Sequence, residues 1–158
     1  MASILLVAHA PLASALQAVA GHAFAESCAR VRAIDVAADT TLAAAEVLVC
    51  EALADLAAAP ALGTVEDADV LVLTDVFGAT PCNAALAAAD SRQAVRVVAG
   101  VNVPMLWRAL CYAQLPVAEL VMRAIDGGRQ GIMQIAAPRR HNQNNPPRSD
   151  DPDTNSDQ

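Results

Sequence analysis

Four short apolar runs, each followed by a segment with helical periodicity, are the feature of this sequence that most restricts its fold. The runs are Ser3–Ala8, Val31–Val36, Asp69–Thr74 and Ala94–Ala99. Continuous apolar runs of this length are typical of strands that are buried on both faces of a sheet. Because strands that alternate with helices form right-handed crossovers, the pattern predicts an α/β domain with a doubly wound, open parallel sheet. We expect four parallel strands in the order 2-1-3-4, with helices on both faces.

Turn residues indicate where the intervening helices begin and end. We expect helices from Pro11 to about Ala25, from Asp39–Thr41 to about Ala58, from Thr80-Pro81 to about Ala89, and from Pro104, with a restart at Pro116, to Gly127-Gly128. Thr80 has the form of an N-cap residue, and Pro81 that of a first-turn proline. The pair Gly127-Gly128 is expected to stop the last helix.

The composition changes abruptly near the end of the chain. Residues 1–137 are expected to form one domain. From Pro138 onward the sequence is rich in Pro, Asn, Asp, Arg and Ser, so it has little apolar surface to bury and we expect a disordered polar tail. Just before it, Ile132–Ala136 alternates weakly and predicts a short final strand.

Charge and composition exclude several classes of function. The net charge is −7 and the estimated pI is about 4.7, which disfavours nucleic acid and anionic membranes as partners. No Lys or Arg precedes Arg30, and no uninterrupted apolar segment reaches the about 20 residues that span a bilayer. We therefore expect a cytoplasmic protein. The four cysteines have no metal-ligand spacing, and neither a metal nor an organic cofactor is expected.

Two polar residues stand directly after apolar strands, His9 after the first and Asp75 after the third. In the order 2-1-3-4 these strands are neighbours at the point where the strand order reverses, and ligands bind there in open α/β sheets. A carboxylate that holds one ring nitrogen of a histidine leaves the other nitrogen free as a nucleophile. With the helix start at Thr80-Pro81, which favours anions, the pair fits phosphoryl transfer. An ordinary histidine at a strand end with simple turn residues nearby fits the same pattern, which alone identifies no reaction.

Four segments, in the same order, resemble the mannose-type enzyme IIA domain of the bacterial phosphoenolpyruvate:sugar phosphotransferase system. They are Ile4–Ala10 (ILLVAHA), Thr74–Ala85 (TDVFGATPCNAA), Val98–Leu106 (VAGVNVPML) and Gly128–Ile132 (GRQGI). The resemblance covers roughly residues 3–136. It implies that His9 accepts the phosphoryl group and that Asp75 is its hydrogen-bonding partner.

The resemblance also implies a surrounding site. We expect the phosphoryl group to be bound around Ala10, Gly78, Thr80 and Pro81, and partner proteins to contact the rim formed by Phe77, Asn102 and Pro104. The sequence departs from the family's pattern at three positions: Ala10 follows the histidine where Gly is frequent, Ala79 replaces the second of two glycines, and Phe77 stands where some members have Trp. These departures leave the rates of phosphoryl transfer open.

In function, the resemblance implies a phosphotransferase component: a phosphohistidine carrier that takes its phosphoryl group from the histidine-containing protein HPr and passes it to an enzyme IIB. It also implies a homodimer in which Ile132–Ala136 pairs antiparallel with the neighbour's sheet. Two alternatives stay open. One is a regulatory relay, or a phosphoryl donor to dihydroxyacetone kinase, without sugar transport. The other is a non-catalytic flavodoxin-like binding module. The sequence identifies neither a sugar nor the acceptor protein.

Overall fold

The computed structural model describes residues 1–26, 28–58, 69–90 and 92–136. Its sheet has four parallel strands, β1 (Ser3–His9), β2 (Val31–Val36), β3 (Val70–Thr74) and β4 (Val95–Ala99). The strand order is β2-β1-β3-β4, which confirms the doubly wound α/β fold predicted from the sequence. The central strands β1 and β3 are buried along nearly their whole length, as their continuous apolar runs predict.

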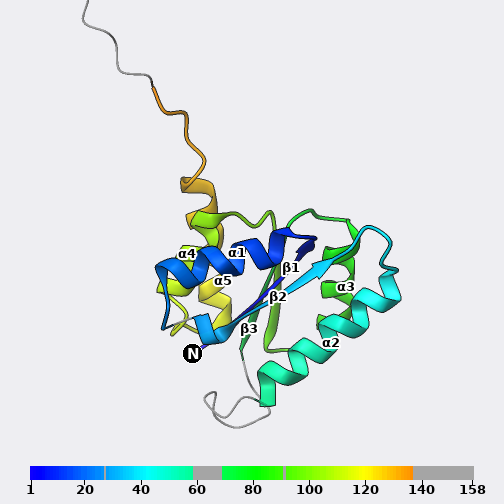
Figure 1. Ribbon diagram of the computed structural model, residues 1–158. Coiled ribbons are helices and arrows are strands. Elements are labelled where there is room, and N and C mark those ends of the chain that lie inside the picture. Colours follow the sequence, from blue (N-terminus) through cyan, green and yellow to red (C-terminus); the bar gives the residue numbers. More distant parts are fainter. Residues whose placement is uncertain (27, 59–68, 91, 137–158) are drawn as a thin grey trace, which may run out of the picture.

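Helices cover both faces of this sheet (Figure 1). The helices are α1 (Leu12–Ala23), α2 (Leu42–Ala58), α3 (Thr80–Ala89), α4 (Val103–Cys111) and α5 (Val117–Gln130), with a 3-10 turn at Cys28–Arg30. Buried residues of α1, α4 and α5 form one core cluster with the sheet, and those of α2 and α3 form the other. None of the helices in the described part of the chain is long and apolar enough to cross a membrane.

Strand β1 divides its side chains between the two cores. Ile4, Leu6 and Ala8 pack in the cluster with α1, α4 and α5, whereas Leu5 and Val7 pack in the cluster with α2 and α3. This alternation follows from the two-residue period of a strand. Since His9 is the next odd-numbered residue of β1, the same period places its side chain on the α2 and α3 side of the sheet.

The prediction that Gly127-Gly128 ends the last helix is wrong. Helix α5 continues through both glycines to Gln130, because these residues let α5 approach α4 closely. A Cβ atom at position 127 would lie 2.5 Å from Cβ of Arg108, and one at position 128 would lie 2.8 Å from Cε of Met105. The glycines therefore act as packing residues inside a helix.

The N-cap of α3 is one residue earlier than predicted. Ala79 has extended backbone angles and is the N-cap, while Thr80 is already the first helical residue. The carbonyl oxygen of Ala79 accepts the N–H of Asn83 at 2.9 Å, so the helical hydrogen bonds begin at Ala79. Thr41, by contrast, caps α2 as expected: its hydroxyl accepts the N–H of Ala44 at 3.3 Å.

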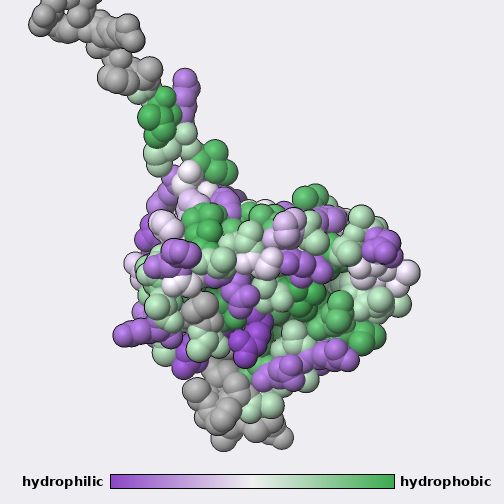
Figure 2. All heavy atoms as spheres, in the orientation of Figure 1, coloured by the Kyte–Doolittle hydropathy of each residue, from purple (hydrophilic) through white to green (hydrophobic). Residues whose placement is uncertain are grey.

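Residues 132–136 form no strand within the single chain. They extend from the end of α5 as an exposed segment, here called the arm, which stands off the body of the molecule (Figures 1 and 2). Its apolar side chains Ile132, Met133 and Ile135 are 66–78% exposed. Pairing with a neighbour's sheet requires a second copy, so the strand exchange stays a prediction. The expected polar tail lies outside the described residues.

Candidate functional site

The structure brings His9 and Asp75 together at the carboxyl ends of β1 and β3. Oδ2 of Asp75 lies 2.7 Å from Nδ1 of the His9 ring and accepts the backbone N–H of His9 at 3.0 Å. The other carboxylate oxygen accepts the N–H of Val76 at 2.8 Å. The Asp75 side chain is only 10% exposed, whereas that of His9 is 50% exposed. The carboxylate is thus fixed in the protein while much of the imidazole faces solvent.

These hydrogen bonds keep Asp75 ionised. Burial raises the pKa of its carboxyl group, but the bonds from the His9 backbone, the His9 ring and the Val76 N–H outweigh burial and hold the pKa below its ordinary value of 3.8. An ionised carboxylate only accepts hydrogen bonds, so Nδ1 must carry the proton in this contact. In the neutral ring, Nε2 then has a free lone pair and is the available nucleophile.

The start of α3, which follows the carboxyl end of β3 as Asp75 does, is suited to an anion at the same edge of the sheet as His9. The N-cap residue of α3, Ala79, makes no side-chain capping hydrogen bond, and a helix start with free N–H groups favours negative charge. Leu5 and Val7 pack in the same cluster as Ala84 and Ala85 of α3. By the two-residue period of β1, the His9 side chain lies on this same face of the sheet. Gly78 precedes the helix with a φ of +83°, a backbone conformation that glycine adopts without strain.

The start of α1 is less suited to an anion than the start of α3, because a carboxylate already binds two of its N–H groups. Its N-cap residue, Pro11, makes no side-chain capping bond. Instead Oδ1 of Asp35, in β2, accepts the N–H groups of Ala13 at 2.9 Å and Ser14 at 3.2 Å. Asp35 is not among the site residues that the sequence predicts. The signal for it is an acidic residue near the end of a mostly apolar strand, VRAIDV, where a half-buried carboxylate needs a partner.

The other predicted anion-binding residues lie at the same edge of the sheet. Ala10 is exposed, and its N–H donates to the carbonyl of Val36 at 3.0 Å. Thr80 is half-buried and Pro81 is buried at the start of α3. No measured contact joins these residues to the His9 ring, so their role toward a phosphoryl group stays a prediction.

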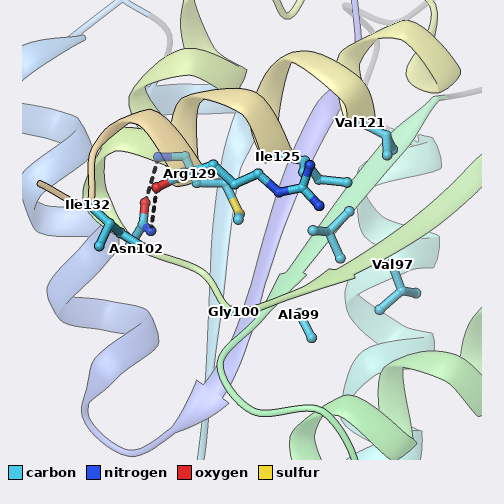
Figure 3. Close-up of a pocket in the computed structure, with 11 residues that line it drawn as sticks. Val97, Ala99, Gly100, Asn102, Val121, Ile125, Arg129 and Ile132 are labelled. Carbon is cyan, nitrogen blue, oxygen red and sulfur yellow. Dashed lines mark hydrogen bonds between the residues drawn. The ribbon is translucent and has the colours of Figure 1, made fainter.

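The three predicted rim residues have different surroundings. Phe77 is 81% exposed in the loop directly after Asp75. Asn102 is the N-cap of α4: its Oδ1 accepts the N–H of Met105 at 2.9 Å, and its Nδ2 donates to the carbonyl of Gly128 at 3.2 Å (Figure 3). Pro104 is half-buried and lies against Gly131 after α5. Asn102 and Pro104 therefore have structural contacts in addition to their predicted part in the rim.

Among the described residues, no group of three or more His, Cys, Asp or Glu side chains is arranged to hold a metal ion. The site itself offers an ionised carboxylate, an oriented imidazole and a helix start at the same edge of the sheet. This combination is suited to nucleophilic attack by a ring nitrogen on an electrophilic group.

A protein-family model, described as the fructose IIA component of the phosphotransferase system (the EIIA-man family), matches residues 3–125. The chain belongs to this family. The EIIA-man match includes His9, Asp75 and the whole sheet. The protein is accordingly a IIA-type component of the phosphotransferase system, a class of phosphotransfer proteins.

Individual relatives agree with the family. The chain is 37% identical over 70 residues to the mannose-specific EIIAB component of Escherichia coli, and this match covers 43% of the chain and 22% of that relative. Among solved structures it is similar to the mannose/sorbose-specific IIA subunit of Enterococcus faecalis, with 25% identity, a TM-score of 0.75, and coverage of 87% and 96% of the two chains. It is also similar to a IIA protein associated with the fucose utilization operon of Streptococcus pneumoniae, with 26% identity, a TM-score of 0.60, and coverage of 80% and 93%.

Proposed function

We propose that the protein is a phosphocarrier in which His9 accepts a phosphoryl group and passes it to a second protein. The observation that carries this proposal is the contact between Oδ2 of Asp75 and Nδ1 of a half-exposed His9 ring. This contact orients the ring and leaves Nε2 free to act as the nucleophile. The start of α3 would then stabilise the charge of the phosphoryl oxygens.

The transfer step is a simple exchange of one bond for another. The Nε2 lone pair of His9 attacks the phosphorus of the donor's phosphohistidine. A P–N bond forms at Nε2 while the donor's P–N bond breaks, and its electron pair leaves with the donor's imidazole. The ring of His9 keeps its Nδ1 proton and gains positive charge, which the Asp75 carboxylate stabilises. Onward transfer reverses these roles.

Two partner proteins follow from this function. We propose phospho-HPr as the donor and an enzyme IIB or a regulatory protein as the acceptor, with the transfer taking place in the cytoplasm. Both must reach the same exposed ring. Val76 and Phe77, directly after Asp75 in the chain, are 56% and 81% exposed, and exposed apolar residues near a reactive group are typical of docking surfaces.

The decisive experiment is a reconstituted relay with labelled phosphoenolpyruvate, enzyme I and HPr. The label is expected on this protein, in an acid-labile form, and on Nε2 by NMR of the phosphorylated ring. His9→Ala should abolish labelling. The matched control is His22→Ala, since His22 is an exposed histidine of α1 whose ring nitrogen Nδ1 lies 3.0 Å from the carbonyl oxygen of Ala18. A bare His9 in the complete relay would instead favour a non-catalytic binding module.

We further propose that the protein is a homodimer in which the arms are exchanged. Strand β4 is at the edge of the sheet, and an unpaired edge accepts a further strand readily. Beside it lies a groove of about 510 Å³ between β4 and α5, which includes Val97, Val121 and Ile125 (Figure 3). Ile132 of the same chain lines part of this groove, and we propose that the weakly alternating, exposed side chains of a second copy's arm occupy the rest of it.

A further inference from the structure

The helix that follows His9 is held in place by a residue of a neighbouring strand. Asp35 is half-buried in β2, opposite Ala8 of β1. Its Oδ1 accepts two backbone N–H groups from the first turn of α1, those of Ala13 and Ser14. Because the N-cap residue Pro11 contributes no side-chain bond, Asp35 is the cap of α1. A carboxylate in this position also stabilises the positive end of the helix.

The connection between His9 and α1 is short. Only Ala10 and Pro11 separate the end of β1 from Leu12, the first residue of α1. The N–H of Ala10 donates to the carbonyl of Val36, also in β2. Because no long loop separates the two elements, a shift of the start of α1 would also displace the backbone of His9.

His9 is thus held from two sides. Asp75 binds its ring and its backbone N–H from the end of β3. Asp35 fixes the next helix from β2. The 2.7 Å contact between Asp75 and Nδ1 depends on the backbone position of His9, since the same carboxylate oxygen accepts both bonds.

We propose that Asp35 is a positioning residue for His9: by capping α1 it keeps the imidazole in the orientation that Asp75 binds. It also occupies two of the N–H groups at the start of α1, which favours the start of α3 as the helix end for a phosphoryl group. The effect on phosphoryl transfer rests on the proposed function, whereas the effect on the ring does not.

The chain offers a matched control at the other end of the strands, where β3 begins. Oδ2 of Asp69, directly before β3, accepts the N–H of Val117 at the start of α5 at 3.2 Å. Asp69→Ala therefore removes a carboxylate cap of the same kind, far along the strands from His9. Any effect of general destabilisation should be shared by the two alanine variants, whereas an effect on His9 should not.

The test combines ¹⁵N NMR of the His9 ring with transfer from phospho-HPr in wild type, Asp35→Ala, Asp35→Asn and Asp69→Ala. In wild type, neutral His9 should carry its proton on Nδ1. In Asp35→Ala both tautomers should be populated, and kcat/KM for transfer should fall on the order of 10–100-fold, as displacement of a reacting group by about 1 Å can cause. Asp35→Asn keeps an acceptor oxygen but no charge, so its values should lie between these. Asp69→Ala should retain the wild-type ring spectrum and transfer rate.

The inference is overturned if folded Asp35→Ala retains the wild-type tautomer, or if Asp69→Ala changes the ring to the same extent. If Asp35→Ala does not fold, Asp35→Asn decides: a ring spectrum equal to that of wild type would overturn the inference. If the tautomer shifts as expected but even wild type accepts no phosphoryl group, the proposed function fails while the positioning role of Asp35 stands.

Discussion

A single oxygen of Asp75 accepts hydrogen bonds from both the ring and the backbone of His9, with Nδ1 at 2.7 Å and the backbone nitrogen at 3.0 Å. This arrangement ties the orientation of the imidazole to the main chain at the end of β1. It also requires an ionised carboxylate, because a protonated one would compete as a donor.

Replacing Asp75 by asparagine should slow phosphoryl transfer without unfolding the protein. The amide can still accept a hydrogen bond, but it cannot stabilise the positive charge that develops on the His9 ring. We expect transfer from phospho-HPr to fall about 100-fold, measured as single-turnover labelling. Asp90→Asn, at an exposed carboxylate after α3, is the control and should transfer at the wild-type rate. An equal rate in the Asp75 variant would remove the orienting role.

The stabilising effect of Asp75 should depend on pH in a defined direction. The pKa of its carboxyl group is lower in the folded protein than its ordinary value of 3.8, so the group contributes stability that is fully present above about pH 4. This contribution is lost as the pH falls through the folded-state pKa. Urea unfolding of wild type and Asp75→Asn should show a smaller difference in free energy at pH 3 than at pH 5. A difference that is larger at pH 3 than at pH 5 would contradict the assignment.

The two glycines of α5 should differ in their response to alanine. An exposed helical Gly→Ala change ordinarily stabilises by up to about 1 kcal/mol. Gly127→Ala should instead destabilise by about 1–3 kcal/mol, because the new Cβ would meet Cβ of Arg108 at 2.5 Å. Gly128→Ala meets Cε of Met105 first, a flexible tip that can move, and should cost less. Urea midpoints measure the change in stability of each variant. Midpoints for Gly127→Ala and Gly128→Ala that both equal that of wild type would show that α4 and α5 separate easily.

Asn102 should behave as a helix cap in stability measurements. Asn102→Ala removes the bond to the Met105 N–H and the bond to the Gly128 carbonyl, so the free energy of unfolding should fall by about 1–2 kcal/mol. Asn102→Asp keeps the capping acceptor but loses the donor, and should recover part of the loss. If alanine leaves stability unchanged but slows transfer, Asn102 acts mainly at the partner-binding rim.

Charges in the arm should prevent dimer formation. Ile132 and Ile135 are 77% and 78% exposed in the single chain, so aspartate at both positions should not disturb the fold of the monomer. We expect a dimer for wild type and a monomer for Ile132→Asp/Ile135→Asp, measured by light scattering after size exclusion. Met122→Asp is the control, since Met122 is 66% exposed on α5 outside the arm. A wild-type monomer, or a double variant that still dimerises, would contradict arm exchange.

Much of this molecule could be predicted from the sequence because it depends on local patterns. The apolar runs predicted the strands, and the alternation with helices predicted the parallel sheet. The order 2-1-3-4 was expected as a common order for such sheets, and the structure has it. The positions of His9 and Asp75, each directly after such a run, placed both at one edge of neighbouring strands. Whether a strand is buried, and where its apolar run ends, depend on residues close together in the sequence, so both can be predicted from the sequence.

Other features were decided only by the tertiary structure. Asp35 of β2 caps α1 by binding the N–H of Ala13, which is 22 residues earlier in the chain. Asn102 at the start of α4 donates to a carbonyl of α5 that is 26 residues later. Gly127 lies inside α5, although the sequence predicts that the helix ends there. In each case the deciding contact joins residues of different elements. Propensity and periodicity describe how a segment prefers to fold, but which N–H meets which carboxylate, or which Cβ a neighbour excludes, is fixed only when the elements pack together.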